Sequence, residues 1–259
     1  MGQAISKNQV DNSITDRSSF GLNGQYVQFE LLLDSLLRIE GTEKDKQELI
    51  SICEKKYIDN KEEMKNVREF KRNYKSDQAL WWYTKESFLY RMLNKALRRQ
   101  DTSLLYLMRF FIGDLWKAIE KHRCQQPIRT YRCQSISQEE FDGLLNATGK
   151  LISMTSFVST SLDAQEARSF LDHSDGLRKV FFEIDADPRL QGVKPFADVT
   201  KLSAHPDERE VIMTVGSVYR ILNVNRDDDQ FWVIRMQLCS EHENSLSNRP
   251  AADVTGCTV

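Results

Sequence analysis

Two carboxylates, Glu208 and Glu210, are separated by one residue and directly precede the apolar run Val211–Met213. If Glu210 opens a strand and Glu208 ends the loop before it, both side chains can point into one cleft from neighbouring backbone positions. Two carboxylates in one cleft can divide general acid and base work between them. The competing interpretation is a chance pair on the surface, because charged residues make up 29% of the chain.

A hydroxyl-rich run and an arginine inside an apolar stretch lie upstream of these carboxylates. The run 157–161 begins Phe-Val and continues with three consecutive hydroxyl residues, which predicts a short strand ending in a turn. Arg132 lies within 129–134, another short aromatic and β-branched stretch. Burying a guanidinium there is costly unless a carboxylate, a phosphate or a ligand meets its donors. A buried structural ion pair is therefore the alternative interpretation of Arg132.

Taken together, these segments resemble the three motifs of the arginine-specific mono-ADP-ribosyltransferases: an Arg motif, a Ser-Thr-Ser motif and a Glu-x-Glu motif. Three motifs in the family's order are far more specific than any one of them. The resemblance spans most of residues 26–240. Its segments are Tyr131-Arg132, 159–161 and 208–210 for the motifs, 196–203 for the turn-rich segment before the glutamates, 215–221 for the strands that follow, and 82–97 for the preceding helices.

The resemblance implies a reaction that breaks the bond between nicotinamide and ribose in NAD⁺, which is a substrate, and it implies no metal. By resemblance, Glu210 hydrogen-bonds the ribose 2′-hydroxyl as positive charge develops on the sugar ring. Glu208 orients the acceptor guanidinium and helps to remove its proton. Arg132 clamps the dinucleotide through phosphate and ribose oxygens. Ser159 hydrogen-bonds Glu210 and fixes its rotamer. The catalytic and NAD⁺-binding candidates are thus Arg132, Ser159 and Glu210, with Glu208 as a fourth catalytic candidate.

One residue departs from the family pattern. Cys133 stands where family members usually carry glycine, directly after the motif arginine. Its side chain either crowds the nicotinamide pocket or points to the other face of the strand. A buried, inert thiol is the favoured interpretation, and a reactive thiol in the pocket is the alternative. Thr160 and Ser161 are expected to hold the strand and the turn rather than to contact NAD⁺.

The elements that would position these residues fall into two parts. Residues 23–125 form the helical part, in which apolar residues recur at steps of three and four, and residues 126–240 form the strand-rich catalytic part, with short β-branched runs between Gly, Pro and Asp-rich turns. This order predicts an α+β fold, with an N-terminal helical lobe packed on a mixed sheet core and an NAD⁺ cleft between them, like that of ADP-ribosyltransferases. Residues 1–22 and 241–259 are predicted to be polar tails.

Composition narrows the partners and the compartment. The 259 residues carry a formal net charge of −2, which is not typical of a nucleic-acid-binding protein. Five cysteines, with no C-x-x-C pair, favour a reducing, cytoplasmic compartment and argue against a zinc site. No apolar run approaches the roughly 18 residues of a membrane span. The expected partners are NAD⁺ and arginine-containing protein acceptors.

The first six residues, Met1–Ser6, fit the N-myristoylation pattern, with glycine at position two and serine at position six. A plain disordered start is the alternative. A single myristoyl chain binds membranes only marginally, so lipidation at Gly2 would give reversible association with the inner membrane surface.

Three other functions compete with arginine-directed transfer. The first is NAD⁺ glycohydrolysis, in which water replaces the guanidinium. The second is a catalytically silent module of the same fold that binds NAD⁺ or a partner, which the side chain of Cys133 makes conceivable. The third is a structural helical adaptor on membranes, but it leaves Arg132 without a partner.

Overall fold

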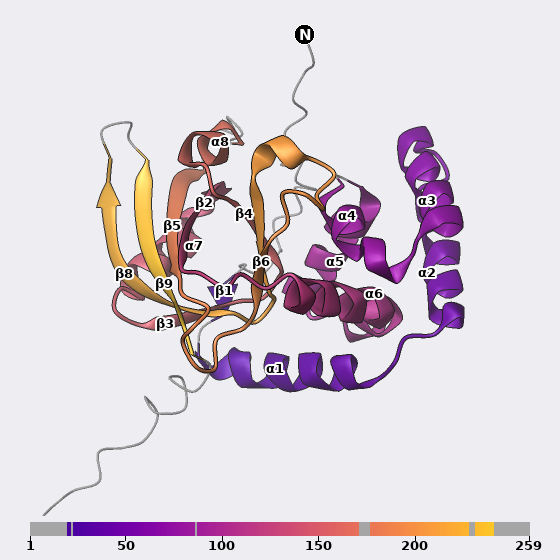
Figure 1. Cartoon of the computed structure of the whole chain (residues 1–259), viewed down its shortest axis with the longest axis horizontal. Helices are drawn as coiled ribbons and strands as arrows, with labels where there is room; N and C mark the ends of the chain where they lie inside the picture. The colour runs from indigo at the N-terminus through magenta and orange to yellow at the C-terminus, as the bar shows by residue number, and fades with distance from the viewer. Residues whose placement is uncertain (1–19, 22, 86, 171–176, 228–230, 241–259) are drawn as a thin grey trace, which may run out of the picture.

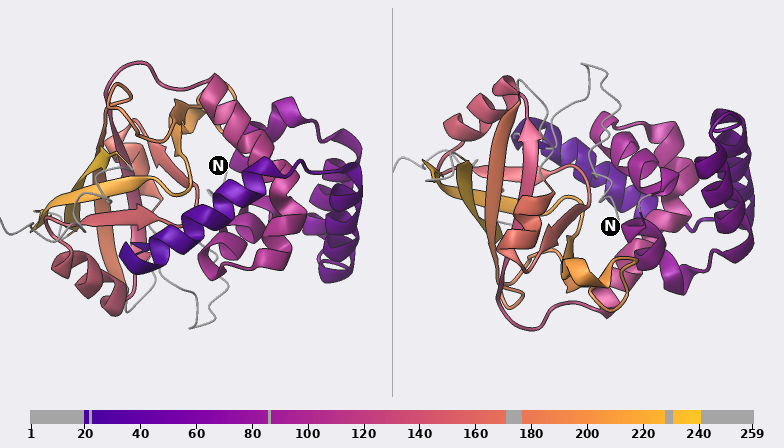
Figure 2. Two further views of the ribbon diagram at one scale, coloured as in Figure 1. Left: turned by 90° about the horizontal axis from the view of Figure 1, so that it is seen from below. Right: turned by 90° about the horizontal axis from the view of Figure 1, so that it is seen from above.

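The structure is a computed structural model that describes residues 20–21, 23–85, 87–170, 177–227 and 231–240 (Figure 1). Helices dominate the first half of the described chain and strands the second half. Figure 2 shows the two halves side by side in both of its views. The predicted α+β class, with a helical lobe packed on a mixed sheet, is confirmed.

The helical half begins with a long helix and continues through a series of capped helices. Thr42 begins α2 with a reciprocal capping box, in which its hydroxyl accepts from the backbone of Asp45 and the Asp45 carboxylate accepts from the backbone of Thr42. Asp101 caps α6 in the simpler way, accepting from the backbone N–H of Leu104. The helices are α1 (Asn23–Arg38), α2 (Glu43–Lys56), α3 (Lys61–Asn73), the 3₁₀ turn η1 (Ser76–Gln78), α4 (Ala79–Thr84), α5 (Phe88–Arg99) and α6 (Thr102–Lys121).

The segment 82–97, similar to helices that precede the Arg motif, spans the end of α4 and most of α5. The Ser87 hydroxyl accepts from the backbone N–H of Leu89, and the buried carboxylate of Glu63 accepts from the backbone N–H of Phe88 at 3.0 Å. These two acceptors satisfy N–H groups that open a new helix. The break between the two helices is therefore a consequence of side-chain capping.

One sheet contains all the strands of the described residues. Its order is β1-β3-β8-β9-β5-β2-β4-β7-β6, and every adjacent pair is antiparallel except the parallel pair β5–β9. The strands are β1 (Phe20–Gly21), β2 (Ile128–Ile136), β3 (Leu151–Met154), β4 (Val158–Ser161), β5 (Arg178–Ala186), β6 (Phe196–Asp198), β7 (Glu210–Met213), β8 (Val218–Arg226) and β9 (Trp232–Cys239).

Two apolar cores lie on opposite sides of strand β7. Val211 and Met213 join the core enclosed by the sheet, together with Val180, Phe182 and other buried residues. Ile212, one residue out of phase, packs instead into the helical core. Because consecutive strand residues face opposite sides, Glu210 shares the helical side with Ile212.

The helices of the strand-rich half are α7 (Gln138–Asn146), α8 (Ala164–Ser169) and the 3₁₀ turn η2 (Pro206–Glu208).

The predicted N-terminal tail requires one correction. Phe20 and Gly21 form β1 and pair with Met154 and Ser153 of β3, although the sequence placed them in a polar tail. Backbone pairing at a sheet edge needs little side-chain pattern, so two residues give no clear sequence signal. The rest of the predicted tails, residues 1–19, 22 and 241–259, lies outside the described residues.

Candidate active site

The strand order places the three sequence motifs next to one another. β4 lies between β2 and β7, with Tyr131 opposite Ser161 in one pair and Ser161 opposite Glu210 in the other. Ser159 is two residues before Ser161 and therefore lies on the same face of β4 as Ser161. The contacts described below join Arg132, Ser159 and Glu210, which come from three neighbouring strands.

Glu210 is the buried carboxylate at the centre of the site. It opens β7, as predicted, and only 2% of its surface is exposed. The hydroxyl of Ser159 donates to one of its oxygens, and the hydroxyl of Ser203 donates to the other at 3.0 Å. A carboxylate held by two hydroxyls from different segments has a fixed orientation, which suits a group that must meet one position on a substrate.

Arg132 lies on β2, an interior strand of the sheet, and contacts Ser159, the residue that also binds Glu210. Its Nη1 donates to the backbone carbonyl of Ser159 at 2.8 Å, and its Nε donates to the side-chain oxygen of Gln134 at 3.0 Å. Within the described residues it forms no ion pair, so a structural salt bridge does not account for its position. The guanidinium is half-buried, is held by two neutral oxygens and retains donors for an anionic ligand.

Glu208 lies on a turn rather than on a strand. It ends η2, and Arg209 follows it in the left-handed region at φ 48° before Glu210 opens β7. The Ser161 hydroxyl donates to the backbone carbonyl of Glu208 at 2.8 Å and so holds the turn, as predicted. Glu208 and Glu210 are not alternate residues of one strand, because Arg209, in the left-handed conformation, lies between them and interrupts the extended backbone.

The helical half supports the segment that carries Ser203 and Glu208. The hydroxyl of Thr84, the last residue of α4, accepts from the backbone N–H of Ala204 at 2.8 Å. The Ser203 hydroxyl in turn accepts from the backbone N–H of His205 at 3.0 Å. Thr84 therefore connects a helix of the first half to the turn before the glutamates.

Tyr83, next to this contact, anchors the strand that bears Ser159. Its hydroxyl donates to the backbone carbonyl of Phe157 at 3.1 Å and accepts from the amide of Asn94 at 3.1 Å. Burial raises the pKa of Tyr83 well above its usual value of 10, so this phenol acts as a neutral hydrogen-bonding group.

The structure adds residues that sequence reasoning did not identify. Ser203 and Thr84 touch the site only because segments distant along the chain meet there. Gln134 was within reach of prediction, because it lies two residues after Arg132 and so on the same face of the strand.

Cys133 points away from the arginine. It is 6% exposed and packs with Phe181 and Ala167 in a small apolar cluster on the opposite face of β2. Burial raises the pKa of its thiol to about 12, so the thiolate is scarce at neutral pH. The prediction that Cys133 is buried and points to the other face of the strand is confirmed. Thr160 also faces away from Glu210 and donates to the backbone carbonyl of Val211, as expected of a residue that holds the strand.

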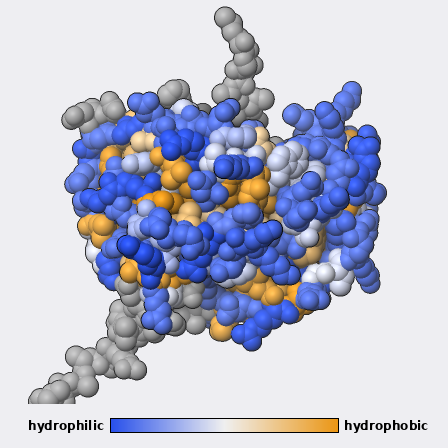
Figure 3. All heavy atoms as spheres, in the orientation of Figure 1, coloured by the Kyte–Doolittle hydropathy of each residue, from blue (hydrophilic) through white to orange (hydrophobic). Residues whose placement is uncertain are grey.

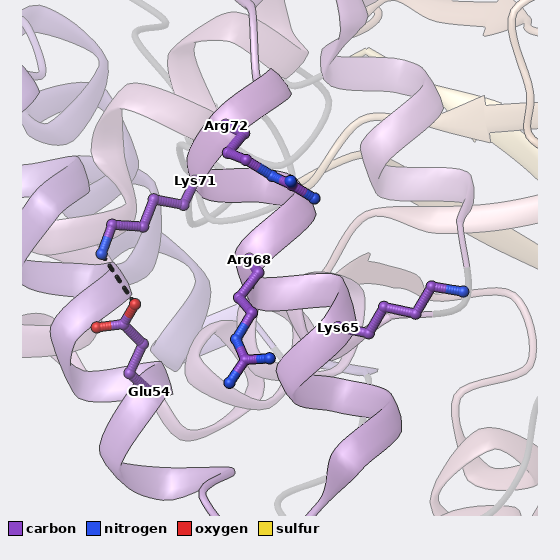
Figure 4. Close-up of a pocket in the computed structure, with 5 residues that line it drawn as sticks. All are labelled: Glu54, Lys65, Arg68, Lys71 and Arg72. Atoms are coloured by element: carbon purple, nitrogen blue, oxygen red, sulfur yellow. Dashed lines mark hydrogen bonds and ion pairs between the residues drawn. The ribbon is translucent and has the colours of Figure 1, made fainter.

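A hollow of about 470 Å³ lies elsewhere, on helices α2 and α3. Figure 4 shows the five residues that line it, Glu54, Lys65, Arg68, Lys71 and Arg72, and none of them is a predicted catalytic residue. Figure 1 shows α2 and α3 at the end of the helical half that lies away from the strands carrying the carboxylate site, so the hollow is separate from that site. Within the described ranges, no group of three His, Cys, Asp or Glu residues could hold a metal ion, and no helix is long and apolar enough to cross a membrane.

Comparison with known proteins gives a family and a fold. The model of the ADP-ribosyltransferase exoenzyme family matches residues 54–240. No curated protein gives a significant sequence match.

Several solved structures share the fold. Vis toxin from Vibrio splendidus, also solved in complex with agmatine, is similar at 21% identity and a TM-score of 0.50, covering 81% of this chain and 91% of its own. HopU1 of Pseudomonas syringae is similar at 16% identity and a TM-score of 0.52, covering 78% and 100%. Plx2a from Paenibacillus larvae is similar at 16% identity and a TM-score of 0.51, covering 76% and 97%. All three are described as ADP-ribosyltransferases or toxins of that activity.

Proposed function

Because the chain belongs to the ADP-ribosyltransferase exoenzyme family, we propose that it moves ADP-ribose from NAD⁺ to arginine side chains of proteins, with release of nicotinamide. The contact of Ser159 with both Arg132 and Glu210 carries the proposal, because it joins a free anion-binding group to an oriented carboxylate. Ser159 offers its carbonyl to the guanidinium and its hydroxyl to the carboxylate, so one residue fixes the spacing of both.

Glu210 stabilises the positive charge that develops on the ribose as nicotinamide leaves. A carboxylate that hydrogen-bonds the ribose 2′-hydroxyl strengthens that bond as the ring becomes cationic. Glu210 is buried, so its charge acts in surroundings of low dielectric, where electrostatic stabilisation is larger than in water. Ser159 and Ser203 hold its two oxygens in place before the reaction begins.

Arg132 binds the diphosphate of the dinucleotide. Its planar guanidinium carries five donors and retains its charge at any pH of interest. Two of these donors already bind Ser159 and Gln134, which fixes the plane of the group. The remaining donors suit phosphate oxygens, which guanidinium groups bind with strong, charge-assisted hydrogen bonds.

Glu208 receives the acceptor. An arginine side chain is a poor nucleophile while it is protonated, so a carboxylate must orient it and help to remove a proton. Glu208 lies on a turn tied to β4 by Ser161 and is half-buried, so a large acceptor can reach it. The complex of Vis with agmatine, a guanidinium compound, supports an acceptor of this chemical class.

A transfer assay tests the proposal. The full chain is incubated with labelled NAD⁺ and an arginine-rich protein, in parallel with Glu210→Gln, which keeps the shape of the side chain but removes its charge. We expect the unaltered chain to label the acceptor and Glu210→Gln to lose labelling and nicotinamide release together. Thr160→Val, which alters a buried hydroxyl on the other face of β4, is the matched control and retains both activities. Absence of transfer by the unaltered chain, or equal transfer by Glu210→Gln, would refute the proposal.

NAD⁺ glycohydrolysis is the second candidate function. The placement of the two glutamates on different elements supports it. Glu210 is locked in β7, whereas Glu208 belongs to a separate turn, so nicotinamide can leave without help from Glu208. Under this function, Glu208→Gln spares nicotinamide release and the unaltered chain labels no protein. A silent binding module would instead bind NAD⁺ in calorimetry without releasing nicotinamide. Cys133 gives no reason for silence, because its side chain lies on the other face of the strand.

A further inference from the structure

Helix α3 presents a row of positive charge on one face. Lys61, Lys65, Arg68 and Arg72 follow one another at steps of four, three and four residues, which places them on one side of a helix. All four are exposed. Figure 4 shows the side chains of the last three on α3, around the hollow of about 470 Å³. We call these four residues the basic row.

Two of the nearby acidic residues, Glu63 and Glu69, do not neutralise the basic row. Four acidic residues lie between positions 55 and 75. Glu63 is buried and binds Arg91, and Glu69 pairs with Lys85 at 2.7 Å. Two of the four acidic residues therefore form ion pairs with residues outside the basic row.

Another ion pair, between Lys71 of α3 and Glu54 of α2 at 2.9 Å, also lines the hollow. Within the described part of the chain, Lys65, Arg68 and Arg72 form no ion pair. Three unpaired cations around one hollow repel one another, and an anionic partner would relieve that repulsion.

An exposed apolar side chain lies at the tip of the same helical hairpin. Ile58, in the turn between α2 and α3, is 70% exposed, the largest value among the exposed large hydrophobic residues of the described chain. Lys55 and Lys56 precede it, and Lys61 follows it. Figure 3 shows the end of the molecule formed by α2 and α3 as predominantly hydrophilic. Ile58 is therefore an exposed apolar side chain on a polar end of the molecule, with several lysines and one aspartate, Asp59, close to it in sequence.

We propose that the tip and basic row of the α2–α3 hairpin dock on a membrane surface that contains anionic phospholipids. Cations attract the headgroups, and an apolar side chain among them can enter the boundary between headgroups and acyl chains. An acidic protein segment would use the charges but has no need of a lone exposed isoleucine. The proposal does not depend on the proposed enzymatic function.

A membrane-binding hairpin would also add to the weak membrane affinity that the predicted myristoyl group at Gly2 would provide. The N-terminal pattern Met1–Ser6 predicts a myristoyl group at Gly2, and one such chain anchors a protein only marginally. A lipid chain combined with a basic patch gives stable attachment. The hairpin would be the second of these two signals.

Vesicle sedimentation of the full, unlipidated chain tests the proposal. The vesicles contain phosphatidylcholine alone or phosphatidylcholine with roughly a third phosphatidylserine, a composition with a negative surface potential. We expect binding only to the anionic vesicles, and weaker binding as the salt concentration rises. The variant that combines Lys65→Gln, Arg68→Gln and Arg72→Gln should bind roughly a hundredfold more weakly, because each basic residue near such a surface contributes about 1 kcal/mol.

A matched variant and an apolar variant complete the design. The control combines Arg38→Gln, Lys121→Gln and Lys150→Gln, which remove the same charge from exposed positions outside the hairpin and should leave binding within about twofold. Ile58→Ser keeps every charge and should weaken binding by about tenfold, the effect of losing a partly buried aliphatic side chain.

Three results would overturn the proposal: no binding of the unaltered chain to anionic vesicles, an equal loss in the control variant, or Ile58→Ser binding as tightly as the unaltered chain. The last result, together with salt-sensitive binding of a polyglutamate peptide, would assign the basic row to an acidic polypeptide instead. The melting temperature and the circular dichroism spectrum of each variant, measured in solution, confirm that the variants are folded.

Discussion

Ser203→Ala should slow the release of nicotinamide from NAD⁺ by roughly ten- to a hundredfold. Ser203 holds one oxygen of the Glu210 carboxylate at 3.0 Å, and both residues are buried, so water cannot replace the lost donor. A hydrogen bond to a charged group contributes about 1.5–3 kcal/mol. Since about 1.4 kcal/mol corresponds to a factor of ten in rate, the stated range follows if the bond is needed in the transition state.

Steady-state kinetics with NAD⁺ as the varied substrate provide the measurement. We expect kcat to fall and KM to change little, because Ser203 positions a carboxylate rather than binding the dinucleotide. Ser203→Thr retains a hydroxyl and should recover part of the rate. In a Glu210→Ala background, Ser203→Ala should have no further effect, because its partner is absent. An equal loss in both backgrounds would refute the argument that Ser203 acts through Glu210.

Three further outcomes can be measured. Thr84→Val should lower both nicotinamide release and transfer to an acceptor protein, each by about tenfold, because it frees from α4 the segment that carries Ser203 and Glu208. Cys133 should resist iodoacetamide in the native chain at pH 8 and react after denaturation, as mass spectrometry can show, because its thiol is buried with a pKa of about 12. Burial opposes ionisation of Asp45, but its hydroxyl and guanidinium partners lower its pKa to about 2. The resulting stability, about 2 kcal/mol, is complete above pH 4 and is lost as the pH falls toward 2. Arg109→Met should lower the melting temperature at pH 7 and weaken its fall toward pH 2, since Arg109 binds Asp45 at 2.6 Å.

The strands around the site were predictable because their residues carry a local signal. The β-branched and aromatic run 179–184 marks β5, which the structure extends to Arg178–Ala186. Glu210 was placed at the start of a strand because an apolar run follows it, and the structure agrees. The proximity of Arg132 to Ser159 was not visible in any local pattern and came from the resemblance of three motifs.

Features that depend on distant contacts were not predictable. The side chain of Ser203 meets Glu210 because the intervening turn folds back, and Thr84 meets Ala204 across 120 positions of sequence. Neither pairing has a periodicity that a sequence could display. The left-handed conformation of Arg209 was also missed, because that conformation is uncommon for residues other than glycine, and the tertiary contacts of the turn impose it here.

The position of β9 affects how the protein matures. β9 is the last strand along the described chain, yet it lies inside the sheet between β8 and β5. Until Trp232–Cys239 has left the ribosome, β1, β3 and β8 have no hydrogen-bonded connection to the five strands from β5 to β6. A nascent chain is therefore left with two unpaired sheet edges, which favour association with other chains. We expect newly synthesised molecules to stay inactive and to need protection from aggregation until β9 has joined the sheet, which would keep a transferase silent until that strand is in place.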